Sequence, residues 1–144
     1  MTEREGSDPY DLQRFVAAQA PVFETACAEL KAARKQSHWM WFIFPQIEGL
    51  GRSPAAKRFA ISGRAEAEAY LRHPVLGSRL RRCTELVHCV EGRSAHQIFG
   101  APDDMKFHSS MTLFGAVAED NWLFLDTLRK YFGGEMDSKT LERL

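Results

Sequence analysis

Apolar residues recur at helical spacing along most of the chain. Residues 74–90 give the clearest case, in which apolar positions follow one another at intervals of four and three: Leu76, Leu80, Cys83, Val87 and Val90. Because an α-helix turns once in about 3.6 residues, these side chains lie on one face, which predicts a buried stripe. Comparable stripes, or residues typical of helix starts such as Ser53–Pro54, Ser62 and Ser94, predict further helices that begin near residues 11, 21, 53, 62, 94, 102 and 119.

Residues typical of helix ends fall at the borders of these stripes. Ser94 and Gln97 have the spacing of a capping box. Asp103 lies in a first turn, where the positive end of the helix dipole favours acids, and Gly133 fits a helix end. The pattern predicts an all-α fold, a single compact multihelical domain over residues 1–144 with about six to eight helices and short connections. Residues 1–9 are expected to be a flexible N-terminal tail.

The densest aromatic segment is HWMWFIF, at residues 38–44. Two structures fit it: a turn of helix, or a short strand buried on both faces, since its large side chains also alternate. Pro45 restricts Phe44 to an extended backbone, so any helix in this segment ends there. In either structure most of this apolar surface must be buried, which makes the segment part of the core.

Charge and cysteine content exclude several classes of function. Lysine plus arginine equals aspartate plus glutamate at 19 each, whereas a protein that grips nucleic-acid backbones carries a basic surplus. We therefore expect no nucleic-acid partner. The cysteines, Cys27, Cys83 and Cys89, fit no zinc spacing. We expect buried free thiols in a reducing compartment and no metal site.

Nothing in the chain predicts a membrane segment or a cofactor. The first ten residues lack the apolar run of a signal peptide, and the longest apolar run is far shorter than the ~20 residues that span a bilayer. We expect a cytoplasmic protein without a membrane partner. The segment GLGRSP at residues 49–54 fits a dinucleotide fingerprint poorly, because Pro54 stands at the position of the third glycine, so no cofactor is predicted.

Polar residues border the aromatic segment. The turn at Gly49 and Gly51 runs into a helix start, where several backbone N–H groups can point at one anion, and Arg52 adds a planar cation that fits a carboxylate or phosphate. The alternative is that the two glycines only make a tight turn. The candidate ligand-binding residues of this segment are His38, Trp41, Gln46, Gly49, Gly51 and Arg52.

A second polar strip lies in DDMKFHSSMTLF, at residues 103–114, on a helix otherwise rich in apolar residues. Lys106, Ser109 and Thr112 are its candidate ligand-binding residues. One explanation is structural: the hydroxyls bond back to carbonyls one turn earlier and the lysine faces solvent. The other is a strip that lines a cavity, or a lysine that activates a serine. No oxyanion hole can be identified, the catalytic residues are unknown, and the sequence leaves open whether the protein is an enzyme.

Four motifs occur together in one order: HWMWFIFPQIEGLGRS, EAEAYLRHPVLGSRL, IFG at residues 98–100, and DDMKFHSSMTLF. In this combination the chain resembles the bacterial domain of unknown function 1810, which automated labels sometimes call calpastatin-like. The resemblance covers nearly the whole chain and implies a compact, mainly helical fold. It implies no activity and no catalytic residues. A calpain inhibitor is a repetitive disordered chain, so the calpastatin label does not suit this aromatic-rich sequence.

Two functions from different classes are consistent with these features. In the first, the protein binds a small anionic or phosphate-bearing metabolite in a pocket between residues 38–53 and 106–112. This hypothesis predicts that the two segments meet in the fold. In the second, the protein is a non-enzymatic interaction module that binds a partner or forms a homodimer through exposed aromatic surface.

Overall fold

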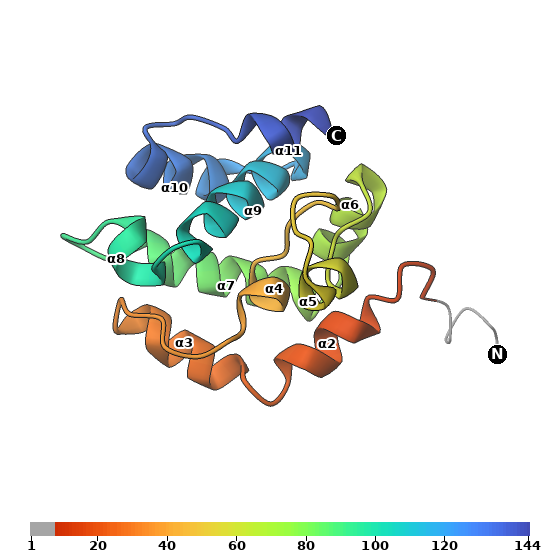
Figure 1. Cartoon of the computed structure of the whole chain (residues 1–144), viewed down its shortest axis with the longest axis horizontal. Helices are drawn as coiled ribbons and strands as arrows, with labels where there is room; N and C mark the ends of the chain where they lie inside the picture. The colour runs from red at the N-terminus through yellow and green to blue at the C-terminus, as the bar shows by residue number, and fades with distance from the viewer. Residues whose placement is uncertain (1–7) are drawn as a thin grey trace.

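The structure, a computed structural model, describes residues 8–144 (Figure 1). The predicted tail at residues 1–9 falls mostly on residues outside this range. The described part contains ten helices in one compact unit: α2 (Gln13–Gln19), α3 (Phe23–Lys31), α4 (Met40–Ile43), α5 (Pro54–Arg58), α6 (Arg64–Arg72), α7 (Leu76–His88), α8 (Ala95–Phe99), α9 (Asp103–Val117), α10 (Trp122–Phe132) and α11 (Ser138–Glu142).

The predicted all-α class is confirmed, but the predicted number of six to eight helices is too low. The two helices beyond the eight predicted starts are α4, which the sequence left open, and α11, and they contain only four and five residues. A single turn cannot show a repeated apolar stripe, so periodicity does not count it reliably. Between residues 8 and 144 no strand forms, and the one isolated β-bridge pairs Ile47 with Ile61.

The long helix α9 runs through the middle of the molecule and packs against α6, α8, α10 and α11 (Figure 1). Helix α9 is buried on almost every side, as expected for a central helix that is not amphipathic. Its Phe107 ring lies 5.0 Å from the Phe44 ring and 4.6 Å from the Phe99 ring, measured between centroids. The core therefore joins α9 to the aromatic segment and to α8.

The stripe predicted for residues 74–90 is confirmed in α7, where all five of its apolar side chains are buried against the core. Helix α7 packs on α3, α6 and α10. The expectation of buried thiols is right for Cys27 and Cys83 and wrong for Cys89, which is exposed. The reason is local: α7 ends at His88, and Cys89 occupies the C-cap.

The structure resolves the ambiguity of residues 38–44 in favour of a helix, because Met40–Ile43 form α4. The helix ends before Phe44 and Pro45, as predicted. Its end is held from outside: the Gln19 side-chain amide donates to the Phe42 carbonyl oxygen at 2.7 Å. This bond satisfies a buried carbonyl that a strand partner would otherwise have to pair.

Predicted helix ends are also present. Ser94 and Gln97 form both bonds of a capping box, and Gly133 adopts the left-handed conformation at the end of α10. None of the helices described between residues 8 and 144 has the length and apolar character needed to cross a membrane.

Candidate functional site

The aromatic segment and helix α9, far apart in sequence, meet at Trp41 and Lys106. The Lys106 ammonium lies 4.8 Å from the centre of the Trp41 ring, which is a cation–π distance. Trp41 is held by the single turn α4, while Lys106 comes from the first turns of α9. The two candidate segments are therefore adjacent.

A groove with two neighbouring parts lies at this junction. The first part, the aromatic hollow, has a volume of about 410 Å³ and is lined by Trp41, Gln46, Ile47, Glu48, Gly49, Gly51, Ala56, Lys57, Phe59 and Ala60. The second part, the lysine hollow, has a volume of about 260 Å³ and is lined by Gln46, Leu50, Gly51, Pro102, Met105, Lys106, Ser109, Asp137 and Lys139. Gln46 and Gly51 line both hollows, so the two are neighbours, and we call them together the groove.

The charges around Lys106 do not balance. Asp103 contacts two ammonium groups, those of Lys35 at 2.9 Å and of Lys106 at 3.4 Å. One carboxylate is thus shared between two cations, which leaves a positive surplus beside the groove. Lys139 adds a further cation to the lysine hollow.

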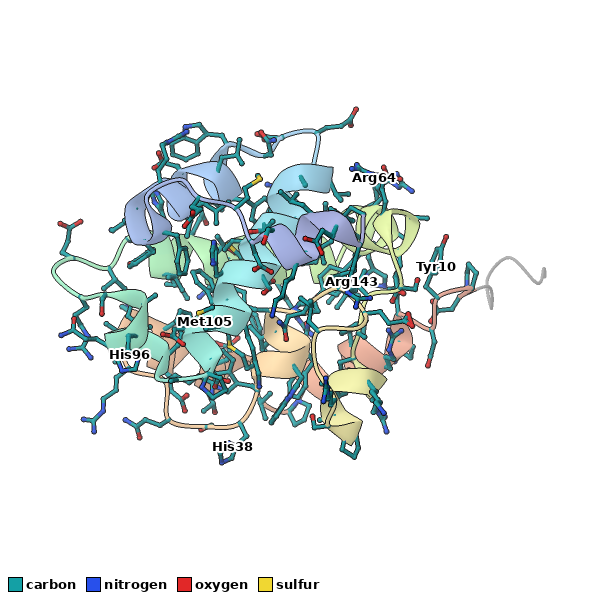
Figure 2. The ribbon with its side chains drawn as sticks, turned by 45° about the horizontal axis from the view of Figure 1, so that its top comes forward. Tyr10, His38, Arg64, His96, Met105 and Arg143 are labelled. Atoms are coloured by element: carbon teal, nitrogen blue, oxygen red, sulfur yellow. The ribbon has the colours of Figure 1, made fainter. Side chains whose placement is uncertain are left out.

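The C-terminal segment completes this side of the groove. Asp137 caps α11 and accepts hydrogen bonds from the Ser109 hydroxyl at 3.0 Å and the Thr140 hydroxyl at 2.5 Å. Arg143, just after α11, places its guanidinium over the Gly49 turn, as Figure 2 shows. Sequence reasoning missed these residues, because a short polar tail carries no signal of what it packs against.

The two glycines have structural reasons of their own. Gly49 has φ +99°, which side-chain-bearing residues rarely adopt, and a Cβ there would collide with the Arg143 guanidinium. At Gly51 a Cβ would lie 2.5 Å from the Ala56 Cβ in α5. The tight turn and the close approach of α5 therefore explain both glycines, and both also line the groove.

The structure separates the predicted site residues into three sets. Trp41, Gln46, Gly49, Gly51, Lys106 and Ser109 line the groove. His38 and Arg52 are exposed and line neither hollow, and Figure 2 shows His38 on the outer edge of the molecule. Thr112 is fully buried and lies outside both hollows. The position of a residue beside the aromatic segment in the sequence did not distinguish these sets. The path of the backbone decides whether its side chain faces the groove.

The hydroxyls of the second strip make the backbone bonds of the structural explanation. The one proton of the Ser109 hydroxyl is shared between the Asp137 carboxylate at 3.0 Å and the Met105 carbonyl at 3.2 Å, and Thr112 donates to the His108 carbonyl at 2.9 Å. Thr112 also accepts the Asp137 backbone N–H at 2.9 Å, which holds the start of α11 against α9. The buried Ser110 hydroxyl has no hydrogen-bond partner within residues 8–144.

Two carboxylates that do not line the groove, those of Glu29 and Glu66, have partners within the fold. Burial raises the pKa of the Glu29 carboxyl, but hydrogen bonds from the Ser37 hydroxyl, from the backbone N–H groups of Gln36 and Ser37 and from the Trp39 indole outweigh it and lower that pKa to about 2. Arg14 pairs with the nearly buried Glu66 at 2.9 Å. Within residues 8–144 no group of three or more His, Cys, Asp or Glu residues is arranged to hold a metal ion.

Sequence and structure comparisons place the chain in a family. The model of the family described as "Protein of unknown function (DUF1810)" matches residues 9–144, and the chain belongs to this family. The resemblance inferred from the four motifs is therefore confirmed.

A solved structure of a relative supports the same fold. It is the crystal structure at 1.38 Å of the conserved hypothetical protein Rv1873 from Mycobacterium tuberculosis, which is 55% identical. The two agree with a TM-score of 0.94 over 95% of this chain and 98% of the relative. No curated protein matches the chain.

Proposed function

We propose that the protein binds a small anionic ligand, such as a phosphate-bearing metabolite, in the groove between α4, α9 and α11. The observation that carries the proposal is the position of Lys106, which lies on the Trp41 ring and lines the lysine hollow. The proposal concerns binding and assigns no reaction.

The electrostatics of Lys106 support an anion rather than a neutral ligand. Its side chain is only 23% exposed, so its charge is less screened than that of a free surface lysine. Its carboxylate partner, Asp103, lies closer to the Lys35 ammonium than to Lys106. A bound anion would balance the surplus charge, and Lys139 provides a second cation on the same side.

The alternative function, an interaction or self-association module, has less support from the described surface. The large apolar side chains that are clearly exposed there are Met105, Trp122 and Leu141, which come from three different helices. Met105 lines the lysine hollow, and Trp122 packs against His88. A homodimer stays a prediction, to be checked by the molar mass in solution at increasing protein concentration.

A thermal-shift titration with inorganic phosphate and pyrophosphate tests the proposal. Binding to the native state alone adds RT ln(1 + [L]/Kd), about 2.7 kcal/mol at a hundredfold excess over Kd. We expect both anions to raise the melting temperature of the wild-type protein at constant ionic strength and to leave that of Lys106→Met nearly unchanged.

Two control variants make the result specific. Lys31→Met removes an exposed lysine of α3, and Arg52→Ala removes the predicted anion ligand that lies outside the groove. Both should keep the full shift. An equal shift in Lys106→Met and the wild type would contradict the proposal, as would the absence of any shift.

A further inference from the structure

The two hollows of the groove differ in chemistry. The lysine hollow presents two cations, Lys106 and Lys139, and one carboxylate, Asp137, which accepts hydrogen bonds from Ser109 and Thr140. The aromatic hollow combines polar and apolar surface in similar measure and holds two aromatic side chains, Trp41 and Phe59; of the residues that line it only Glu48 and Lys57 are charged, with opposite signs. A simple anion would occupy the first hollow and leave the second to water, whereas a ligand with an anionic end and an uncharged flat end would use both.

Trp41 lines the aromatic hollow and contacts Lys106, which lines the lysine hollow. Its ring is half-buried, so part of its surface remains available to a ligand, and the Lys106 ammonium lies 4.8 Å from its centre. An anion that binds Lys106 on the side of the aromatic hollow would therefore lie close to the indole. Any ring attached to that anion can pack against Trp41, and Phe59 supplies a second aromatic side chain in the same hollow.

Gln46 provides a polar group where the hollows join. Its backbone carbonyl accepts the Ile61 N–H at 2.9 Å, but its side-chain amide makes no hydrogen bond to any of residues 8–144. An amide offers both donors and an acceptor, which suits the edge of a heteroaromatic ring or a sugar hydroxyl.

From these three observations we infer that the ligand is a ring-bearing anion of the nucleoside monophosphate class. Its base packs against Trp41 and Phe59, and its phosphate faces Lys106 and Lys139. This inference rests on the proposed anion site and adds the requirement for a ring, which an anion site alone does not need.

Calorimetric titration with four probes tests the inference: AMP, UMP, ribose 5-phosphate and adenosine. Stacking of a base on an aromatic side chain is expected to tighten binding about tenfold or more. At least one nucleotide should therefore bind about tenfold more tightly than ribose 5-phosphate. Adenosine, which lacks the anion, should bind more weakly than AMP.

Variants at the tryptophans locate the effect. Trp41→Leu keeps an apolar side chain and should abolish the preference for nucleotide over ribose 5-phosphate, while the exposed Trp122→Leu should preserve it. If Trp41→Leu does not fold, Trp41→Phe replaces it and should reduce the preference. Nucleotide should also quench wild-type tryptophan fluorescence more strongly than that of Trp41→Phe.

The outcomes separate this inference from the proposed function. If ribose 5-phosphate and both nucleotides bind equally and lose affinity in Lys106→Met, the anion site stands and the requirement for a ring is wrong. A nucleotide preference that persists in Trp41→Leu also overturns the inference. If no phosphate compound binds, both proposals fail.

Discussion

The ammonium of Lys106 lies against the ring of Trp41, with 4.8 Å between the nitrogen and the ring centre. This contact joins α4 to α9 and brings a residue of the aromatic hollow against a residue of the lysine hollow. Because neither residue is fully exposed, the contact contributes to the position of both side chains as well as to the charge of the site.

The energy of this contact can be measured with a double-mutant cycle. Cation–π pairs at partly exposed positions are worth about 0.5–1 kcal/mol. We expect urea unfolding of Lys106→Met, Trp41→Leu and the double variant to give a coupling energy of about that size. The matched pair Lys106→Met and Trp122→Leu involves residues not in contact and should be additive. Additivity in the first pair would contradict the contact.

Substitution of Gly49 should destabilise the protein. Gly49→Ala places a side chain at φ +99° and into the Arg143 guanidinium, for which we expect a cost of about 1–3 kcal/mol in the free energy of unfolding. In the double variant Gly49→Ala/Arg143→Ala, the part of this cost that comes from the collision with Arg143 should be recovered. The part that comes from the backbone conformation at Gly49 should remain. Gly63→Ala is a control, because Gly63 has an extended backbone and open space around it, and it should cost less than Gly49→Ala.

Removal of the Asp137 carboxylate should loosen the C-terminal helix. Asp137→Ala loses the cap of α11 and the bond from Ser109, and caps of this kind are worth about 0.5–2 kcal/mol. Hydrogen exchange of the α11 amides should therefore accelerate. The exposed Asp120→Ala serves as control. Unchanged exchange in α11 would show that the cap does not hold this helix.

The Glu29 carboxyl should make stability depend on acidic pH. Its pKa is lowered from 4.5 to about 2 because hydrogen bonds to the charged form outweigh the effect of burial. The contribution is therefore fully present above pH 4.5 and is lost as the pH falls toward 2. Glu29→Gln should flatten this part of the stability profile and cost about 1–3 kcal/mol at neutral pH, the usual value of hydrogen bonds to a charged group.

A urea-unfolding series between pH 6 and pH 2 measures this dependence. Glu24→Gln, at an exposed position of the same helix, should leave the profile close to that of the wild type. An unchanged profile in Glu29→Gln would show that the carboxyl is not stabilised in the folded state.

Local sequence patterns were sufficient to predict the all-α class and the helices with the clearest apolar stripes. The stripe of α7 is encoded by spacing alone, because residues that repeat every 3.6 positions share a face whatever the rest of the chain does. The helix ends at Ser94 and Gly133 could also be predicted from neighbouring residues, because a cap bonds to the backbone of its own turn. Pro45 likewise fixed the end of the aromatic segment.

Contacts between distant segments settle several features that the local sequence pattern leaves open. Within the aromatic segment, residues 40–43 form a helix, and Gln19, from another helix, donates to the Phe42 carbonyl. The structure directs Lys106 into the groove and leaves Arg52 outside it, although both are cations beside polar turns. It also brings Asp137, Lys139 and Arg143 to the groove, because the end of the chain packs back on α9 and the Gly49 turn. Such placements depend on contacts between distant segments, which the spacing of residues along the chain does not encode.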